Sequence, residues 1–84
     1  MRITFKLYAT LGDYLPAEQR QGNVLPMDVA PEASIAEIIE PFNMPPRLVH
    51  LVLVNGVYIQ PEERATRTLK EGDVLAIWPP VAGG

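Results

Sequence analysis

The residues best suited to chemistry in this sequence stand at its C-terminal end, in the stretch WPPVAGG. The tail after the tryptophan consists of Pro79, Pro80, Val81, Ala82, Gly83 and Gly84. Proline fixes φ and has no backbone N–H, so strand pairing should stop at the two prolines and the chain should leave the sheet extended. Six extended residues reach about 20 Å, and the small residues after the prolines can enter a narrow channel in another protein. The group delivered there is the carboxylate of Gly84.

A carboxylate is a poor electrophile, and this chain contains no group that could activate its own. The sequence has no G-x-x-x-x-G-K loop for ATP, no cysteine, and a single histidine, His50, beside an apolar strand. We therefore expect no active site, bound cofactor or metal site in the chain itself. Gly84 is the expected reacting residue, activated by an adenylating partner that uses ATP and magnesium. Sulfur or an amine could then attack the acyl adenylate.

Hydrophobic patterning predicts three of the strands. The segment RITFKLY at 2–8 alternates strictly, with its isoleucine, phenylalanine and leucine facing one way, which predicts a half-buried strand. The last predicted strand is VLAIW at 74–78, and it is apolar on both faces, as is LVLV at 51–54. Such strands are typical of the middle of a sheet that is covered on both sides.

The remaining predicted elements are a helix, a hairpin and a short strand. Ser34 and Glu37 form an S-x-x-E capping box before apolar residues at helical spacing, and Pro41 limits the regular helix to about two turns. The pair Asn55-Gly56 between apolar runs predicts a β-hairpin. The segment LPMDV at 25–29 predicts a short strand, and its proline places that strand at a sheet edge.

One face of the predicted sheet lacks a covering layer. The single helix can cover the face of Ile77, whereas Tyr8 and Trp78 have the parity of the opposite face. We infer that another protein covers this opposite face, because aromatic side chains favour the centres of interfaces. Tyr8 and Trp78 are thus expected to bind a partner, together with tail residues 79–83. The alternative is that the segment 9–24 folds over this face and makes Trp78 a core residue.

Composition limits the classes of protein. The chain has 84 residues, 48% of them hydrophobic and 20% charged, which fits one small domain with one core. The formal net charge is −3 and the 7 Lys and Arg residues are scattered, so we expect no nucleic-acid binding and a partner with a basic surface. No apolar run approaches the ~20 residues of a membrane span, and the start lacks a signal-peptide core. The expectation is a soluble, cytoplasmic protein without membrane contact.

The hairpin NG after LVLV, the run EGDVLAIWPP and the terminal VAGG together resemble the MoaD/ThiS family of ubiquitin-like sulfur carriers, over essentially the whole chain. The resemblance implies a β-grasp fold of the α+β class, with a mixed sheet of four or five strands and one main helix in residues 1–78, and an extended Gly-Gly tail at 79–84. In this family an ATP-dependent enzyme adenylates the terminal glycine, which corresponds to Gly84. A sulfur donor then converts that glycine to a thiocarboxylate.

The ending PPVAGG resembles the molybdopterin branch of the family more than the thiazole branch. The resemblance therefore implies the small subunit of a molybdopterin synthase, whose tail inserts into the large catalytic subunit and delivers sulfur in molybdenum cofactor biosynthesis. Three alternatives stay open: a sulfur carrier for thiamine thiazole or another metabolite, a ubiquitin-like modifier joined through Gly84 to a lysine amine, and an interaction module with an idle tail. The sequence does not fix the sulfur acceptor, the activating enzyme or the oligomeric state.

Overall fold

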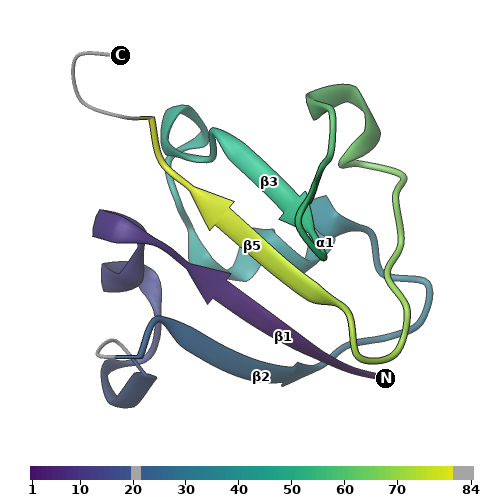
Figure 1. Cartoon of the computed structure of the whole chain (residues 1–84), viewed down its shortest axis with the longest axis horizontal. Helices are drawn as coiled ribbons and strands as arrows, with labels where there is room; N and C mark the ends of the chain where they lie inside the picture. Colours follow the sequence, from purple (N-terminus) through teal and green to yellow (C-terminus); the bar gives the residue numbers. More distant parts are fainter. Residues whose placement is uncertain (20–21, 81–84) are drawn as a thin grey trace.

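The computed structural model describes residues 1–19 and 22–80, which form one mixed sheet with a short helix on one face (Figure 1). The strands are β1 (Arg2–Leu7), β2 (Val24–Asp28), β3 (Leu51–Val54), β4 (Val57–Tyr58) and β5 (Val74–Trp78). Their order across the sheet is β2-β1-β5-β3-β4. β1 and β5 are parallel, and the other neighbouring pairs are antiparallel. The first and last strands therefore lie side by side and end at the same end of the sheet.

The main helix begins at the predicted capping box. α1 (Ile35–Ile39) follows Ser34, whose backbone N donates to Oε1 of Glu37 at 2.9 Å, while the backbone N of Glu37 donates to Oγ of Ser34 at 3.1 Å. The hydrogen bond from the Ser34 backbone most of all, and then the Ser34 side chain, hold the pKa of the Glu37 carboxyl below its ordinary value. A 3-10 segment, η3 (Glu40–Phe42), contains the predicted proline, and Asn43 ends it with a left-handed φ of 55°. Together α1 and η3 make about the two turns expected.

The hydrophobic core lies between this helix and one face of the sheet. The fully buried side chains are Ile3, Phe5, Leu7, Leu11, Leu15, Ile35, Val52, Leu75 and Ile77. They include the odd-numbered residues of β1 and β5, whose side chains point to the helix side of the sheet. Full burial of one such side chain contributes about 1.5 to 3 kcal/mol. The alternate residues of the same strands are consequently left on the face that the helix does not cover.

The segment between β1 and β2 packs into the same core. Its described part forms η1 (Ala9–Tyr14) and η2 (Ala17–Gln19), and Leu11 and Leu15 belong to the buried cluster that also contains the helix residue Ile35. Within its described residues this segment therefore packs on the helix side of the sheet. The alternative that it buries Trp78 on the opposite face is wrong, because that side chain is 39% exposed.

The hairpin and the edge strand follow their predicted turn and proline. Asn55 and Gly56 connect β3 to β4 with φ of 51° and 83°, the positive values that a tight hairpin turn requires. At the opposite edge, the backbone N–H of Leu7 donates to the carbonyl of Asn23. In the register of β1 and β2, the odd-numbered residues of β2 therefore direct their backbone groups toward β1, and the even-numbered residues direct theirs outward. Pro26 therefore directs its backbone outward, where its missing N–H interrupts no ladder. The predicted strand at 25–29 was placed one residue too late.

No helix in the described ranges is long and apolar enough to cross a bilayer. The C-terminal end of β5 lies beside the start of β3, next to η4 (Pro46–Leu48) (Figure 1). This end of the sheet is where the predicted tail begins, so it is the place to look for a functional site.

Candidate functional site: the base of the tail

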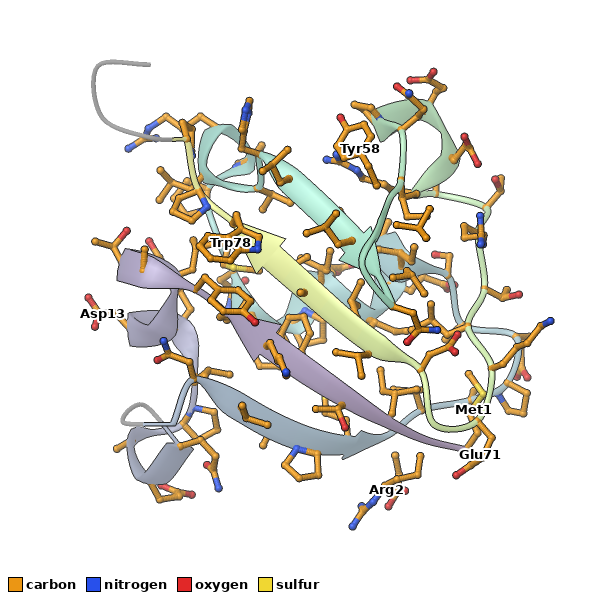
Figure 2. The ribbon with its side chains drawn as sticks, in the orientation of Figure 1. Met1, Arg2, Asp13, Tyr58, Glu71 and Trp78 are labelled. Carbon is orange, nitrogen blue, oxygen red and sulfur yellow. The ribbon has the colours of Figure 1, made fainter. Side chains whose placement is uncertain are left out.

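Two aromatic rings stack where β1 and β5 end. Tyr8 directly follows β1 and Trp78 is the last residue of β5, and because the strands are parallel both residues reach the same end of the sheet. Their ring centroids are 3.9 Å apart and their planes differ by 3°. Trp78 lies on the face of the sheet turned away from α1 (Figure 2). The structure thus brings together the two aromatic residues that the sequence placed on this face.

Backbone hydrogen bonds on both sides of β5 hold its last two residues in place before the tail begins. The N–H of Tyr8 donates to the carbonyl of Ile77 at 3.1 Å, and the N–H of His50 donates to the carbonyl of Trp78 at 3.2 Å. His50 is exposed, as expected of an edge residue. The prolines follow immediately, so the position from which the tail departs is set by two neighbouring strands.

The stack is part of a larger apolar surface. We call this surface the open face, and its apolar members include Tyr8, Leu51, Leu53, Tyr58, Val74, Ala76 and Trp78. Leu51, the partner of Trp78 across β3 and β5, is 38% exposed, and Tyr58 on the edge strand is 41% exposed. Large apolar side chains grouped on a surface in this way mark interaction sites. The open face is therefore the candidate docking surface, and the tail departs from its edge.

The charges on the open face differ in sign from the chain as a whole. Lys6 lies on β1 between Val24 of β2 and Ala76 of β5, and its side-chain ammonium has no hydrogen bond or ion pair with any residue that the structure describes. The guanidinium of Arg64 lies 5.9 Å from the centre of the Tyr58 ring. At the far end Arg2 and Asp28 pair at 3.2 Å and add no net charge. The net charge of the chain predicts a basic partner surface, and this stays a prediction; the Lys6 ammonium on this face would complement a carboxylate.

Arg64 is a residue that the sequence analysis did not single out. Its Nε and Nη2 each donate to the carbonyl of Ile59 at 3.2 Å, Nη1 donates to that of Val49 at 3.4 Å, and Nη2 donates to that of His50 at 3.2 Å. One side chain thereby joins the chain before β3 to the chain after β4. Arg67 lies in the same polar stretch and is exposed, so residue type gave no signal that separates the two.

Two pockets of the described part of the chain lie away from the base of the tail. One pocket of about 290 Å³ lies on the helix side and is lined by Ala36, Ile39, Glu40, Met44, Pro46, Val49 and Arg64. A second of about 260 Å³ is lined by Val54, Asn55, Val57, Arg67, Thr68, Lys70 and Asp73. Neither lining contains a nucleophile with an adjacent base. Within residues 1–19 and 22–80 no three His, Cys, Asp or Glu side chains are grouped to hold a metal ion.

The sequence-predicted site is only partly within the described chain. Pro79 is half-buried and Pro80 is exposed. Val81, Ala82, Gly83 and Gly84 lie outside the described residues, so their roles in the tail stay predictions. What the described chain provides is a fixed point of departure for such a tail beside an apolar face.

Comparisons with known proteins agree with the fold. The model of the family described as Mut7-C ubiquitin matches residues 1–83. A search of curated proteins gave no match. Among solved structures, SAMP1 from Haloferax volcanii is 24% identical with a TM-score of 0.68 and is covered in full, as is this chain. The HVO 2177 protein from the same organism is 21% identical with a TM-score of 0.72, over 100% of this chain and 87% of that one. The predicted ubiquitin-like β-grasp fold, with five strands and one main helix, is confirmed.

Proposed function

We propose, since this chain belongs to the Mut7-C ubiquitin family, that it is a ubiquitin-like sulfur carrier with Gly84 as its reacting C-terminal residue. The observation that carries the proposal is the base of the tail. Pro79 and Pro80 follow a strand end that hydrogen bonds from two neighbouring strands hold in place, and the open face lies beside it. A carrier needs a fixed body that a partner can grip and an extended segment that reaches the partner's active site, and this arrangement supports both.

The proposed chemistry takes place in the partner. A carboxylate oxygen of Gly84 attacks the α-phosphorus of ATP, pyrophosphate leaves, and an acyl adenylate forms. A sulfur nucleophile such as hydrosulfide then attacks the acyl carbon, and AMP leaves with the electrons of the C–O bond. The product is a thiocarboxylate. This chain supplies the carboxylate and its reach, whereas ATP and magnesium are bound by the adenylating partner.

We propose that the partner docks on the open face. Trp78 and Leu51 are exposed there and lie next to the departing tail, so a protein that covers them has its own cleft within reach of that tail. Central aromatic side chains commonly contribute most of the binding energy of an interface. Lys6 would then face a carboxylate of the partner.

The sulfur acceptor that we propose is a pterin precursor of the molybdenum cofactor, with this chain as the small subunit of a molybdopterin synthase. The ending PPVAGG supports this branch through its resemblance to MoaD-type tails. Transfer to thiamine thiazole or to another metabolite uses the same thiocarboxylate. The acceptor is identified by incubating the thiocarboxylate form with each candidate catalytic subunit and precursor and measuring which one removes the sulfur.

A second candidate, a ubiquitin-like modifier, is favoured by the ubiquitin character of the family. A lysine amine of a target protein would attack the same acyl adenylate, AMP would leave, and an amide would form at Gly84. The experiment that separates the two is intact mass spectrometry after incubation with the adenylating enzyme, ATP, magnesium and sulfide. A carrier gains one sulfur in place of one oxygen at its last residue, whereas a ladder of lysine conjugates without that species supports the modifier.

A further inference from the structure

We propose that the pocket on the helix side is a second docking site, which takes one large apolar side chain of another protein together with a neighbouring lysine or arginine. The residues that line this pocket of about 290 Å³ include none of the open face. A protein that covers Trp78 and Leu51 therefore leaves the pocket free for another. The proposal concerns a further partner and does not depend on the reaction of Gly84.

The apolar part of the pocket is built from two segments that pack on the same core. Ala36 and Ile39 come from α1, and Met44 and Val49 come from the connector between η3 and β3. Met44 is buried, and Ile39 and Val49 pack against the buried cluster, so these walls are supported by the core. The volume of about 290 Å³ is at the lower limit of the range for small-molecule sites. Its size and its apolar walls suit a single large apolar side chain.

The cation of the lining is already occupied within the fold. The guanidinium of Arg64 donates to three backbone carbonyl groups, and its Nη2 and Nε both take part. It also lies 5.9 Å from the centre of the Tyr58 ring. A guanidinium has five N–H groups, and these contacts use most of them. Arg64 therefore forms a wall of the pocket and has little capacity left for an anionic ligand.

The carboxylate of Glu40 is the charged group of the lining that stays free. Glu40 is exposed, and its side chain has no hydrogen bond or ion pair with any residue that the structure describes. α1 and η3 carry two acidic residues, Glu37 and Glu40, and no basic residue. Arg47 lies on η4, next to the lining residue Pro46. A cation of the occupant is therefore attracted to the α1 side of the pocket and repelled on the η4 side.

Charge also separates the possible occupants of the pocket. A second copy of the chain brings a net charge of −3 at pH 7. The tail of this chain contains no cation and ends in the carboxylate of Gly84. Both would bring negative charge toward the free carboxylate of Glu40. A protein segment with an apolar residue next to a lysine or arginine instead matches both the apolar walls and the charge.

Selection of peptides tests the site in the full chain. The probe is a random peptide library displayed on phage, and we expect the enriched peptides to share a large apolar residue next to Lys or Arg. Ala36→Phe places a ring in the pocket and should weaken their binding about tenfold or more. Ala30→Phe is the matched control, because Ala30 is also exposed but lies outside the lining. Circular dichroism verifies that both variants are folded.

Charge exchange tests the orientation of the bound segment. Fluorescence polarisation measures the affinity of the best synthetic peptide for each variant of the full chain. Glu40→Lys should weaken binding about threefold, and Arg47→Glu should strengthen it by a smaller factor. A peptide in which glutamate replaces the lysine or arginine should reverse the effect of Glu40→Lys. Trp78→Ala should leave the affinity unchanged, because Trp78 belongs to the open face.

Several results would overturn the proposal. These are the absence of enriched peptides, peptides without the pair of apolar and basic residues, and equal binding to Ala36→Phe and Ala30→Phe. Tighter peptide binding by a chain that lacks residues 81–84 would make the tail the occupant, and self-association that Ala36→Phe abolishes would make it a second copy. If Ala36→Phe does not fold, the charge exchange at Glu40 decides, and no reversal contradicts the proposal. Sulfur incorporation at Gly84 is measured separately, so this proposal and the carrier function can fail independently.

Discussion

Tyr8 and Trp78 are 70 positions apart in sequence, yet their rings stack at 3.9 Å because β1 and β5 are parallel neighbours in the middle of the sheet. The pair stands where the chain leaves its last strand. It therefore joins the body of the fold to the segment that we propose carries the reaction. The relationship links two properties of this molecule: its topology and its open face.

Truncation of the Trp78 side chain, the exposed ring of this pair, should weaken binding of the partner. Trp78→Ala is expected to lower the binding free energy for the partner by ~2 kcal/mol or more, while the isolated domain stays folded. Isothermal titration calorimetry measures the first quantity and thermal unfolding the second. Val57→Ala is the matched control, because Val57 is 63% exposed but has the parity of the helix face. Equal losses in both variants would remove the open face as the docking surface.

The charge on the open face should steer association. Lys6→Glu is expected to reduce the association rate constant for the partner several-fold at low salt, because an unpaired cation in the middle of the face is replaced by an anion. Stopped-flow fluorescence measures this rate. Lys70→Glu changes the net charge equally, but outside the open face, and should have a much smaller effect. A faster association of Lys6→Glu would mean that the partner surface is basic.

Arg64 should be important for stability although it lies in a polar loop. Arg64→Lys loses the planar fork that bonds three carbonyl groups, and we expect a decrease of about 2 kcal/mol in the free energy of unfolding. Arg67→Lys is the control, since its contact with Glu63 is a single exposed ion pair at 3.9 Å, for which a change below about 0.5 kcal/mol is expected. Urea denaturation compares the two variants, and equal stabilities would show that the carbonyl contacts contribute nothing.

The capping box should make stability depend on pH in the acid range. The pKa of Glu37 is lower in the folded chain than its ordinary value. Between these two pKa values the unfolded chain binds more protons than the folded chain, so the free energy of unfolding rises with pH there. The contribution is fully present above the ordinary glutamate pKa of about 4.3 and is lost as pH falls through the lower folded value. Glu37→Gln keeps a side chain that can accept the hydrogen bond but does not titrate, so its stability should fall less over this interval. Ser34→Ala should cost about 1 kcal/mol at neutral pH.

Local rules explain which parts of the fold were predictable. The alternation of β1, the Ser34–Glu37 capping box and the Asn55-Gly56 turn each depend on neighbours within a few residues, and all three were predicted correctly from sequence. The edge position of β2 was also predicted, because its proline cannot donate to a ladder.

Long-range relationships were not predictable in the same way. The parallel pairing of β1 with β5 was not predicted, since alternation fixes the faces of a strand but not its neighbours. The role of Arg64 depends on three carbonyls that only the folded chain brings together. Leu69 did give a signal, because it is the single large apolar residue in the stretch 60–73, and it is buried.

The central claim is that Gly84 carries the reaction, and removal of that residue tests it most directly. The full chain and a chain lacking Gly84 are each incubated with the adenylating enzyme, ATP, magnesium and sulfide, and their intact masses are measured together with Tm and partner affinity. We predict that one oxygen is replaced by sulfur in the full chain and that none is replaced in the shortened chain, because loss of the last residue moves the carboxylate by more than the reaction geometry tolerates. Tm and partner affinity should change little, because chain termini tolerate truncation. Sulfur incorporation at the same rate in both chains would contradict the account.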